Sequence, residues 1–425
     1  MSSTEASAVG RQAALASGYP WLLIGLLWPV AFVTSAGRST LIAVMPQLRE
    51  EFTLSATQLA LVNSAAFWIY AIGAFLFGRL GDGSHRSRLI VFGLVFWSVA
   101  TGLTSVSTGL ALLIALRGLV AIGEASYYPT GTALISDWHA VKMRGRALSV
   151  HQTGVFAGAS VGALSAGLIA DRFGWRVPFV ILGSVGMVVC AVLFRSLRDA
   201  PHGQPATAVS EPANDGPLRM VLKRPPALYV CAVFFLASGA GAGIAVWAPT
   251  FLHDTLGLDL AGSALYGLVM MNIAGLVFVP LGTLLAERFA VRTPMGHFYT
   301  LAIGLALAGL LLLPLVAAKS ALGVGWVLLA SSAGKGLFDG CIYAAMHDVV
   351  PRRARGTAVG LMTMIGFCGA GLMPIFVAQA SGVVGMAAAM TSMAVLYFIA
   401  AVLLLATRAS TRNMILETRH SESHS

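Results

Sequence analysis

The sequence predicts an all-α polytopic membrane protein with twelve transmembrane helices in two pseudo-symmetric six-helix bundles. The chain has 425 residues, of which 57% are hydrophobic and only 10% are charged, whereas an ordinary soluble domain is about 25% charged. Apolar runs of roughly 18 residues or more, the length that crosses a bilayer, recur along the whole chain. A repeat between the two halves of the chain completes the prediction.

The apolar runs define twelve spans. We expect helices, because an isolated strand cannot satisfy its backbone in lipid and the alternation of a barrel strand is absent. The spans are placed at residues 20–44, 57–80, 88–106, 109–136, 146–170, 177–195, 227–250, 263–286, 296–317, 322–349, 356–379 and 384–406. The polar N-terminus lacks the layout of a cleaved signal peptide, and the apolar run after it is too long for a signal-peptide core, so that run is expected to be the first retained span.

Basic residues are unevenly distributed between the two sides of the predicted bilayer. Of the 27 Lys and Arg residues, twenty fall on the side that holds both termini, four on the other side and three inside spans. Cytoplasmic loops are enriched in Lys and Arg, so both termini are expected in the cytoplasm. The expected location is the inner (plasma) membrane of a bacterium. The net charge of +10 is therefore a topology signal and does not indicate a nucleic-acid partner.

A polar stretch from Arg195 to Pro226 separates the sixth span from the seventh. It is rich in Pro, Ala and charged residues without an apolar period, which predicts a mobile cytoplasmic linker. The expected organisation is an N-terminal tail at 1–18, a first six-helix bundle at 19–195, a linker at 196–226, a second six-helix bundle at 227–406 and a C-terminal tail at 407–425.

The two halves repeat with an offset of 211 residues, the separation of Asp137 from Asp348. Each of these aspartates is followed seven residues later by an arginine and a glycine. The same offset aligns Glu124 with Lys335 and Tyr128 with Asp339, so the fourth and tenth spans carry ionisable residues at matching depth. Two parallel halves related by an axis along the membrane normal are a known transporter layout.

The loop between the second and third spans reads Gly78-Arg-Leu-Gly-Asp82-Gly-Ser-His-Arg86-Ser-Arg88. It resembles the loop signature of the major facilitator superfamily, in which an aspartate follows a glycine by four residues and basic residues come next. Residues 282–292, in the equivalent loop of the second half, are a degraded copy. The resemblance covers essentially the whole chain and implies the major facilitator fold.

Three segments are similar to the anion:cation symporter branch of that superfamily: residues 36–46, residues 64–71, and Arg117 together with residues 123–125. The segment Gly-Glu-Ala-Ser-Tyr at residues 123–127 also resembles the spinster-like lipid transporters.

The symporter resemblance implies that Arg38, Tyr70 and Arg117 hold an organic anion and that Glu124 takes part in proton coupling. The sequence departs from this family at Gly37, where an acidic residue or an asparagine is usual. One possible protonation site is therefore missing, and Glu124 becomes the main candidate proton carrier.

The charges inside the predicted spans are three cations, Arg38, Arg117 and Lys335, and two carboxylates, Glu124 and Asp339. One interpretation pairs Arg117 with Glu124, and Lys335 with Asp339, which neutralises the core without a ligand. It leaves Arg38 without a partner, and a lone buried cation is costly. The other interpretation adds a bound anion, because guanidinium groups hold carboxylates by two parallel hydrogen bonds. The cations are then substrate ligands, and the two carboxylates carry protons.

Charged residues at the expected cytoplasmic ends of the spans form a candidate gate. They are Asp82, Arg86, Arg88, Asp137, Arg144, Asp348 and Arg355. A charge-assisted network at these helix ends is stable when the central cavity opens outward and must break when it opens inward. The alternative is that the basic residues only set the topology.

The function expected from these features is secondary active transport, a proton-coupled symport of a small organic anion (a sugar acid or another carboxylate) by alternating access. The alternative is an exporter or antiporter of amphiphilic, drug-like or lipid-like compounds. The coupling ion is H⁺ or possibly Na⁺, and the expected state is a monomer in the lipid bilayer. An enzyme, a cofactor and a metal site are not expected, because the sequence shows no nucleophile–base pair, phosphate loop or ligand spacing, and all four cysteines lie in apolar segments.

Overall fold

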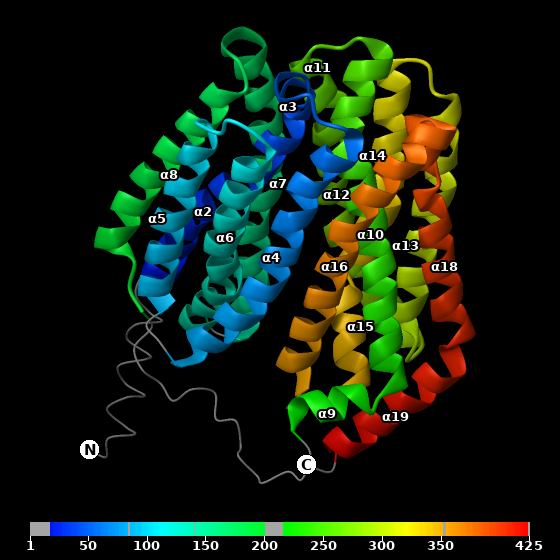
Figure 1. Cartoon of the computed structure of the whole chain (residues 1–425). Helices are drawn as coiled ribbons and strands as arrows, with labels where there is room; N and C mark the ends of the chain where they lie inside the picture. Colours follow the sequence, from blue (N-terminus) through cyan, green and yellow to red (C-terminus); the bar gives the residue numbers. More distant parts are fainter. Residues whose placement is uncertain (1–17, 84–85, 140, 200–215, 352–353, 424–425) are drawn as a thin grey trace.

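The computed structural model describes residues 18–83, 86–139, 141–199, 216–351 and 354–423, which form two helical bundles side by side (Figure 1). The first bundle consists of α2 (Tyr19–Ala43), α4 (Ala56–Gly83), α5 (Arg86–Thr104), α6 (Leu110–Trp138), α7 (Val141–Phe173) and α8 (Arg176–Ser196). The second bundle consists of α10 (Pro225–Leu256), α11 (Leu260–Ala264) continued by η1 (Leu265–Val269) and α12 (Met270–Arg292), α13 (Gly296–Leu312) with η2 (Leu313–Ala317), α14 (Ala321–Asp339) with α15 (Ile342–Val349), α16 (Arg355–Val384), and α17 (Met386–Thr391) with α18 (Met393–Ala406).

Eleven helical segments among the described residues are long and apolar enough to cross a membrane. The remaining predicted span, residues 57–80, forms the 28-residue helix α4. The prediction of an all-helical membrane protein with two six-helix halves is confirmed.

The tenth predicted span differs from a continuous helix, because α14 ends at Asp339 and α15 begins at Ile342. Gly340 in this break lies against α12, so closely that a Cβ atom there would be 2.3 Å from the carbonyl oxygen of Val279. The hydroxyl of Thr283 donates a hydrogen bond of 2.8 Å to the carbonyl of Gly340. The carbonyl of Gly340 thus bonds to α12, whereas a carbonyl inside a helix bonds to the next turn of its own helix. This bond and the close contact explain why the helix is interrupted directly after Asp339.

Two further helices occur where the sequence predicted a linker and a tail. α9 (Pro217–Leu222) lies in the last part of the expected linker, and α19 (Arg408–Ser423) occupies the expected C-terminal tail. Val221 of α9 and Ile415 of α19 are fully buried. These apolar side chains supply the contacts that a mobile segment would lack, so the expectation of an irregular linker was wrong for residues 217–222; residues 200–215 lie outside the described part of the chain.

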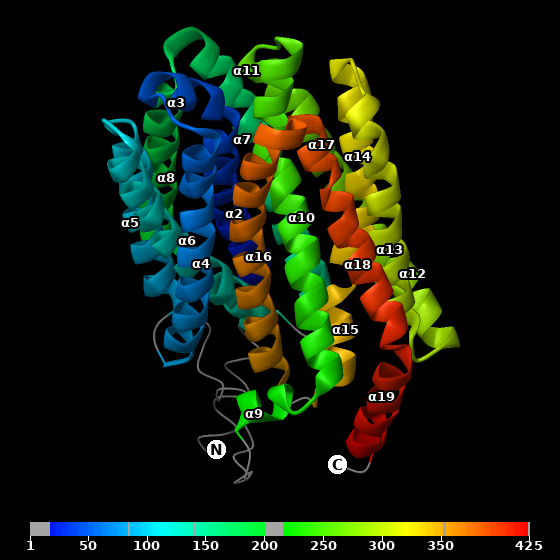
Figure 2. The same ribbon diagram turned by 45° about the vertical axis from the view of Figure 1, so that its right-hand side comes forward.

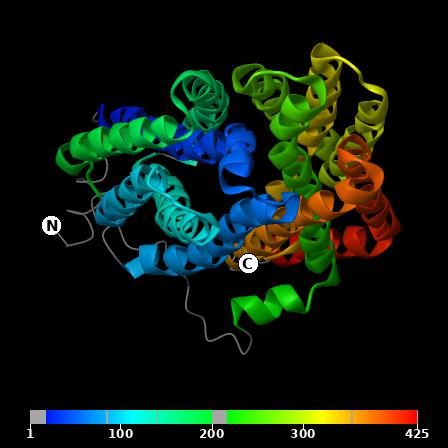
Figure 3. The same cartoon turned by 45° about the horizontal axis from the view of Figure 1, so that its top comes forward.

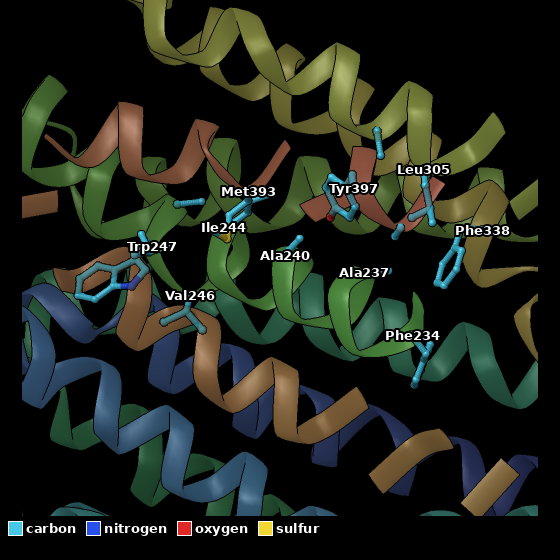
Figure 4. Close-up of a cluster of buried hydrophobic side chains, with 14 of the residues drawn as sticks. Phe234, Ala237, Ala240, Ile244, Val246, Trp247, Leu305, Phe338, Met393 and Tyr397 are labelled. Carbon is cyan, nitrogen blue, oxygen red and sulfur yellow. The ribbon is translucent and has the colours of Figure 1, made fainter. Parts of the chain in front are cut away.

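The core of the second bundle surrounds α10 (Figure 4). Phe234, Ala237, Ala240 and Trp247 of this helix are buried, and the helices that pack against α10 include α16, α18 and α14. The indole of Trp247 donates a hydrogen bond of 2.9 Å to the carbonyl of Pro374 in α16. A buried Trp needs such a partner for its N–H group, and here it ties α10 to the proline-containing middle of α16.

In the first bundle, α2 packs tightly against α7 through small residues. A Cβ atom on Gly158 would lie 2.1 Å from the carbonyl oxygen of Phe32, and one on Gly162 would lie 2.4 Å from the Cα atom of Ala36. The GxxxG spacing of these glycines permits this backbone approach, as in other membrane helix pairs. The contact fixes the position of the part of α2 that carries Arg38.

The two ends of the molecule differ in charge. We call the end that holds Arg86, Arg144, Arg198 and Arg355 the basic end, which lies at the bottom of Figure 1. We call the other end, which holds α3 (Met45–Phe52) and α11, the opposite end. Figure 2 shows the same arrangement from a second direction, and Figure 3 shows the two bundles meeting along α4, α16, α7 and the α11–α12 segment.

Polar contacts join the two bundles between the opposite end and the middle of the helices. Arg49 of α3 makes a bidentate ion pair with Asp254 of α10. Asp171 of α7 accepts hydrogen bonds of 3.1 Å from the backbone N–H groups of Leu260 and Ala261 at the start of α11. Nearer the middle, the indole of Trp68 in α4 donates a hydrogen bond of 3.3 Å to the carbonyl of residue 368 in α16. These contacts hold the bundles together in the half of the molecule distant from the basic end.

Candidate functional site

A buried carboxylate with two side-chain donors lies at the centre of the first bundle. Glu124 of α6 is 4% exposed. Its Oε2 atom accepts a hydrogen bond of 2.7 Å from Nε of Arg38 in α2, and its Oε1 atom accepts one of 2.9 Å from Nε1 of Trp97 in α5. Three helices therefore converge on one carboxylate, and a charge-assisted pair of this kind is among the stronger hydrogen bonds in proteins.

The positions of these donors follow from close helix packing. A Cβ atom on Gly123 would lie 2.7 Å from the Cβ atom of Trp97, so only glycine allows α5 to approach α6 this closely. The approach places the indole of Trp97 beside the carboxylate of the next residue, Glu124. On the other side of the cluster, the tight contact of α2 with α7 holds Arg38 at the required depth.

Arg117, seven residues before Glu124 on α6, is also buried and is 2% exposed. Its Nε and Nη1 atoms have no hydrogen-bond partner among the described residues. It lies close enough to Glu124 and Arg38 to interact electrostatically with both. The described cluster therefore contains two guanidinium groups and one carboxylate, and part of one guanidinium has nothing to bond to.

The ligand-free interpretation of the sequence was wrong in one respect. That interpretation paired Arg117 with Glu124 and left Arg38 without a partner, whereas the hydrogen bond to Glu124 comes from Arg38. Two turns along one helix separate Arg117 from Glu124 by about 10 Å, while α2 brings Arg38 to the carboxylate from the side. The unsatisfied cation is Arg117.

Tyr70 of α4 connects this cluster to the second bundle. The Cζ atom of Arg38 lies 4.5 Å from the centroid of the Tyr70 ring, a cation–π contact. The Tyr70 ring also lies beside that of Phe367 in α16, with centroids 4.7 Å apart. Phe67 of α4 also faces Phe367, at 6.0 Å. The charged cluster is thus bounded by an aromatic group to which both bundles contribute.

Lys335 and Asp339 of α14 form a separate pair in the second bundle. Nζ of Lys335 donates hydrogen bonds of 2.8 and 2.6 Å to the two carboxylate oxygens of Asp339 one turn later. A Cβ atom on Gly241 would lie 2.7 Å from Cε of Lys335, so the pair packs against α10. Within the described residues, no hydrogen bond or ion pair links Lys335 to Arg38, Arg117 or Glu124. This geometry is the one expected if Asp339 neutralises Lys335 without a ligand.

Five of the predicted gate residues make contacts inside their own bundle: Arg86, Asp137, Arg144, Asp348 and Arg355. Arg86 at the start of α5 makes an ion pair with Asp137 near the end of α6. Nε of Arg144 donates a hydrogen bond of 3.2 Å to the carbonyl of His139. Both partners of the ion pair belong to one bundle, so it need not break when the bundles rock, contrary to the expectation for a gate. Asp82 falls in the last turn of α4, and its side chain lies outside the described part of the structure.

The second bundle repeats this arrangement with a histidine. Asp348 of α15 bonds to Nδ1 of His297 at 2.6 Å, and Arg355 donates to the carbonyl of His347 at 3.4 Å. His297 is 211 residues after Arg86, the same offset that relates Asp348 to Asp137. Sequence reasoning assigned no role to His297, although the repeat offset applied to Arg86 points to it.

Other polar side chains of α6 and α7 near the cluster form hydrogen bonds between helices. The hydroxyl of Tyr127 donates to the carbonyl of Leu27 at 2.8 Å and lies 2.6 Å from Nε2 of His151. The hydroxyl of Tyr128 donates to Oε1 of Gln152 at 3.1 Å. Trp97, the second donor to Glu124, was not singled out from the sequence, because a tryptophan in an apolar span gives no indication of which way it points.

Eleven apolar helical segments among the described residues, together with α4, and a buried cluster of charges inside the first bundle define a polytopic membrane protein of the transporter class. A family model described as Major Facilitator Superfamily matches residues 27–332. The chain belongs to this superfamily, whose members are transporters and not enzymes, as the sequence predicted.

Several curated proteins are similar to the chain. The probable sulfoacetate transporter SauU of Cupriavidus necator is 26% identical over 83% of this chain and 84% of the relative. The probable anion transporter 4, chloroplastic, of Oryza sativa is 26% identical over 76% of this chain and 57% of the relative. Protein spinster homolog 1 of Homo sapiens is 27% identical over 69% and 60%. The chain spans only about half the length of several plant relatives, including the rice protein.

The fold is also that of a solved structure. The crystal structure of a bacterial homolog to the human lysosomal transporter spinster, in an inward-facing and unoccupied conformation, matches with a TM-score of 0.81. The match covers 95% of this chain and 99% of that chain at 20% sequence identity. A likeness at this identity establishes the shared fold.

Proposed function

We propose that this chain is a proton-coupled symporter of a small organic anion, a sugar acid or another carboxylate, working by alternating access. The observation that carries the proposal is the state of Arg117, a buried guanidinium with two N–H-bearing atoms that lack partners. A buried donor without a partner costs about 1–3 kcal/mol. A carboxylate supplies two acceptors and the charge that balances Arg117, since Glu124 already bonds to Arg38.

The names of the relatives support an anion as substrate. They include a hexuronate transporter of Bacillus subtilis, an ascorbate transporter of Arabidopsis thaliana and the probable sulfoacetate transporter. All three names specify small oxygen-rich anions. We propose the same chemical class for this chain, with Arg38 and Arg117 as the direct ligands and Tyr70 as a hydrogen-bond donor from the side of α4.

Proton coupling is proposed to run through Glu124. The Arg38 side chain is 35% exposed and that of Glu124 is 3% exposed, so an entering anion meets the arginine first. An anion that takes Arg38 away from Glu124 leaves a buried carboxylate with one donor fewer, which favours uptake of a proton. Substrate and proton would then enter together. Asp339 is proposed as a secondary site of proton coupling, because its ion pair with Lys335 already balances its charge.

Alternating access is proposed to involve rocking of the bundles about the contacts near Tyr70 and Phe367. The contacts of Arg49 with Asp254, and of Asp171 with α11, would close the opposite end. We further propose that the basic end and both termini face the cytoplasm of a bacterial inner membrane, on the positive-inside rule, and that a monomer is sufficient.

A second candidate function is export of amphiphilic or lipid-like compounds. The aromatic group of Phe67, Tyr70 and Phe367 favours it, since these rings offer an apolar surface beside the charged cluster. Similarity to protein spinster homolog 1 is consistent with either candidate.

The test is uptake into proteoliposomes that contain the full chain. The substrates are labelled hexuronate, sulfoacetate, ascorbate and phosphate under an imposed pH or Na⁺ gradient, with efflux of a fluorescent lysophospholipid measured in parallel. We expect uptake of at least one carboxylate driven by the pH gradient. Arg117→Ala should reduce it by about thirtyfold or more, since truncating one side of a buried charge pair costs about 2 kcal/mol or more.

Two variants separate the parts of the proposal. Glu124→Gln should keep exchange of substrate across the membrane but lose accumulation driven by the pH gradient. Arg195→Gln, at the exposed end of α8, is the matched control and should behave as the wild type. Undiminished uptake by Arg117→Ala would exclude the anion site, and lysophospholipid efflux without carboxylate uptake would establish the second candidate instead.

A further inference from the structure

A cavity of about 680 Å³ lies between α4, α5 and α6, outside the charged cluster. Its walls are mainly aromatic and aliphatic, and include Phe77 of α4, Phe92 and Phe96 of α5, and Ile122 of α6. Its volume falls within the range of about 300–1,000 Å³ that is typical of small-molecule sites. We call it the lateral groove.

The lateral groove faces the bilayer. Figure 1 shows α6 between α5 and α4, on the outer face of the first bundle. Phe92 is 71% exposed, Phe96 43% and Ile122 37%. Large apolar side chains exposed on a membrane-crossing helix contact lipid chains. An occupant that enters from the bilayer can therefore leave its chain in the groove and its polar end at the membrane surface.

The basic end of the lateral groove is lined by Arg88, in the first turn of α5. Its side chain is exposed, and no ion pair or hydrogen bond involves it in the part of the chain that the structure describes. Arg86, two residues earlier, differs because it is paired with Asp137. The groove thus combines an apolar trough at membrane depth with an exposed guanidinium at the interface.

We propose that the lateral groove is a binding site for an anionic phospholipid. One acyl chain lies along Phe92, Phe96 and Ile122, and the phosphate is held by Arg88. Guanidinium binds phosphate by paired hydrogen bonds, and a basic residue near the membrane surface adds about 1 kcal/mol of attraction for anionic lipid. This site is separate from the proposed substrate site and does not depend on which anion is transported.

The floor of the groove gives the bound lipid a structural role. Gly93, Gly123 and Ser126 line it, and a Cβ atom on Gly93 would lie 1.8 Å from the hydroxyl of Ser126. The same close approach of α5 to α6 positions Trp97 beside Glu124. A chain packed over this seam fills the space outside it, and so supports the contact that orders the carboxylate.

The test is native mass spectrometry of the purified full chain, titrated with phosphatidylglycerol or with phosphatidylcholine of the same acyl chains. We expect the wild type to bind its first molecule of phosphatidylglycerol with about fivefold higher affinity than its first molecule of phosphatidylcholine. This factor corresponds to about 1 kcal/mol for one arginine. Arg88→Gln should remove this preference. Arg195→Gln, another exposed arginine at the basic end, should retain it.

Two further arms identify the source of the phosphate and the place of the chain. Soluble glycerol 3-phosphate should not compete at concentrations that saturate the lipid, because it lacks the acyl chain. Ile122→Trp narrows the groove and should weaken binding of both lipids. Equal loss of preference in Arg88→Gln and Arg195→Gln would show a general charge effect and overturn the proposal. Unchanged lipid binding by Ile122→Trp, or competition by glycerol 3-phosphate, would also overturn it.

Discussion

The two arginines of the charged cluster should respond to removal in opposite directions. Arg117→Met removes a buried guanidinium whose Nε and Nη1 atoms lack partners and replaces it with an apolar chain of similar length. An unsatisfied buried donor costs about 1–3 kcal/mol, so the substrate-free protein should become more stable by at least about 1 kcal/mol. Replacing buried charges by apolar residues of similar volume often has this effect.

Arg38→Met should destabilise the protein. It removes the partner of Glu124, whose side chain is 3% exposed. Breaking a fully buried pair costs about 3–5 kcal/mol, but the Arg38 side chain is 35% exposed and the carboxylate can take up a proton. We therefore expect about 2 kcal/mol for this variant, with the sign opposite to that of Arg117→Met.

The measurement is thermal unfolding in detergent at neutral pH without organic acids. For a unit of 150–250 residues, about the size of one bundle, 1 kcal/mol shifts Tm by about 2–4 °C. Arg117→Met should raise Tm and Arg38→Met should lower it. Added substrate should raise the Tm of the wild type but not that of Arg117→Met. A fall in Tm for Arg117→Met, or shifts of the same sign in both variants, would refute the assignment of Arg117 as the unsatisfied cation.

Two other predictions concern the ends of the helices. Asp171→Ala removes the acceptor that joins α7 to the start of α11. Loss of a helix cap costs about 1 kcal/mol, so the population of molecules that are open at that end should rise about fivefold. Spin labels on Thr57 and Lys319 should then report longer distances, and an unchanged distance distribution would contradict the prediction. His297→Arg should keep wild-type transport and Tm, because the equivalent residue of the first bundle is an arginine paired with an aspartate. His297→Ala is the comparison and should lower Tm; equal Tm values for the two variants would show that the contact with Asp348 adds nothing.

Much of the fold could be predicted from the sequence because the lipid solvent imposes it. Continuous apolar runs can only be helices in a bilayer, and the basic residues and the offset of 211 residues were visible without coordinates. The break at Gly340 could not be predicted, because it depends on the approach of α12 to that residue. α9 was missed because six residues of mixed character are too few to show a period.

The candidate site was predicted in its members but not in its pairing. Arg38, Arg117 and Glu124 are conspicuous because ionisable residues are rare in apolar runs. The spacing of Arg117 and Glu124 indicated only that these two residues share a face of α6. Which side chain reaches the carboxylate is decided by how α2 and α5 pack against α6, a tertiary property, and this is also why Trp97 was not foreseen.

The closure of the charged cluster within the first bundle has a consequence for biosynthesis. Arg38, Trp97, Arg117 and Glu124 all precede residue 196, where α8 ends. N-terminal units generally fold first during synthesis, so the pair of Arg38 and Glu124 can form while the second bundle is still on the ribosome. Nascent chains stalled after α8 should already contain this pair, whereas the contact of Tyr70 with Phe367 must wait for α16.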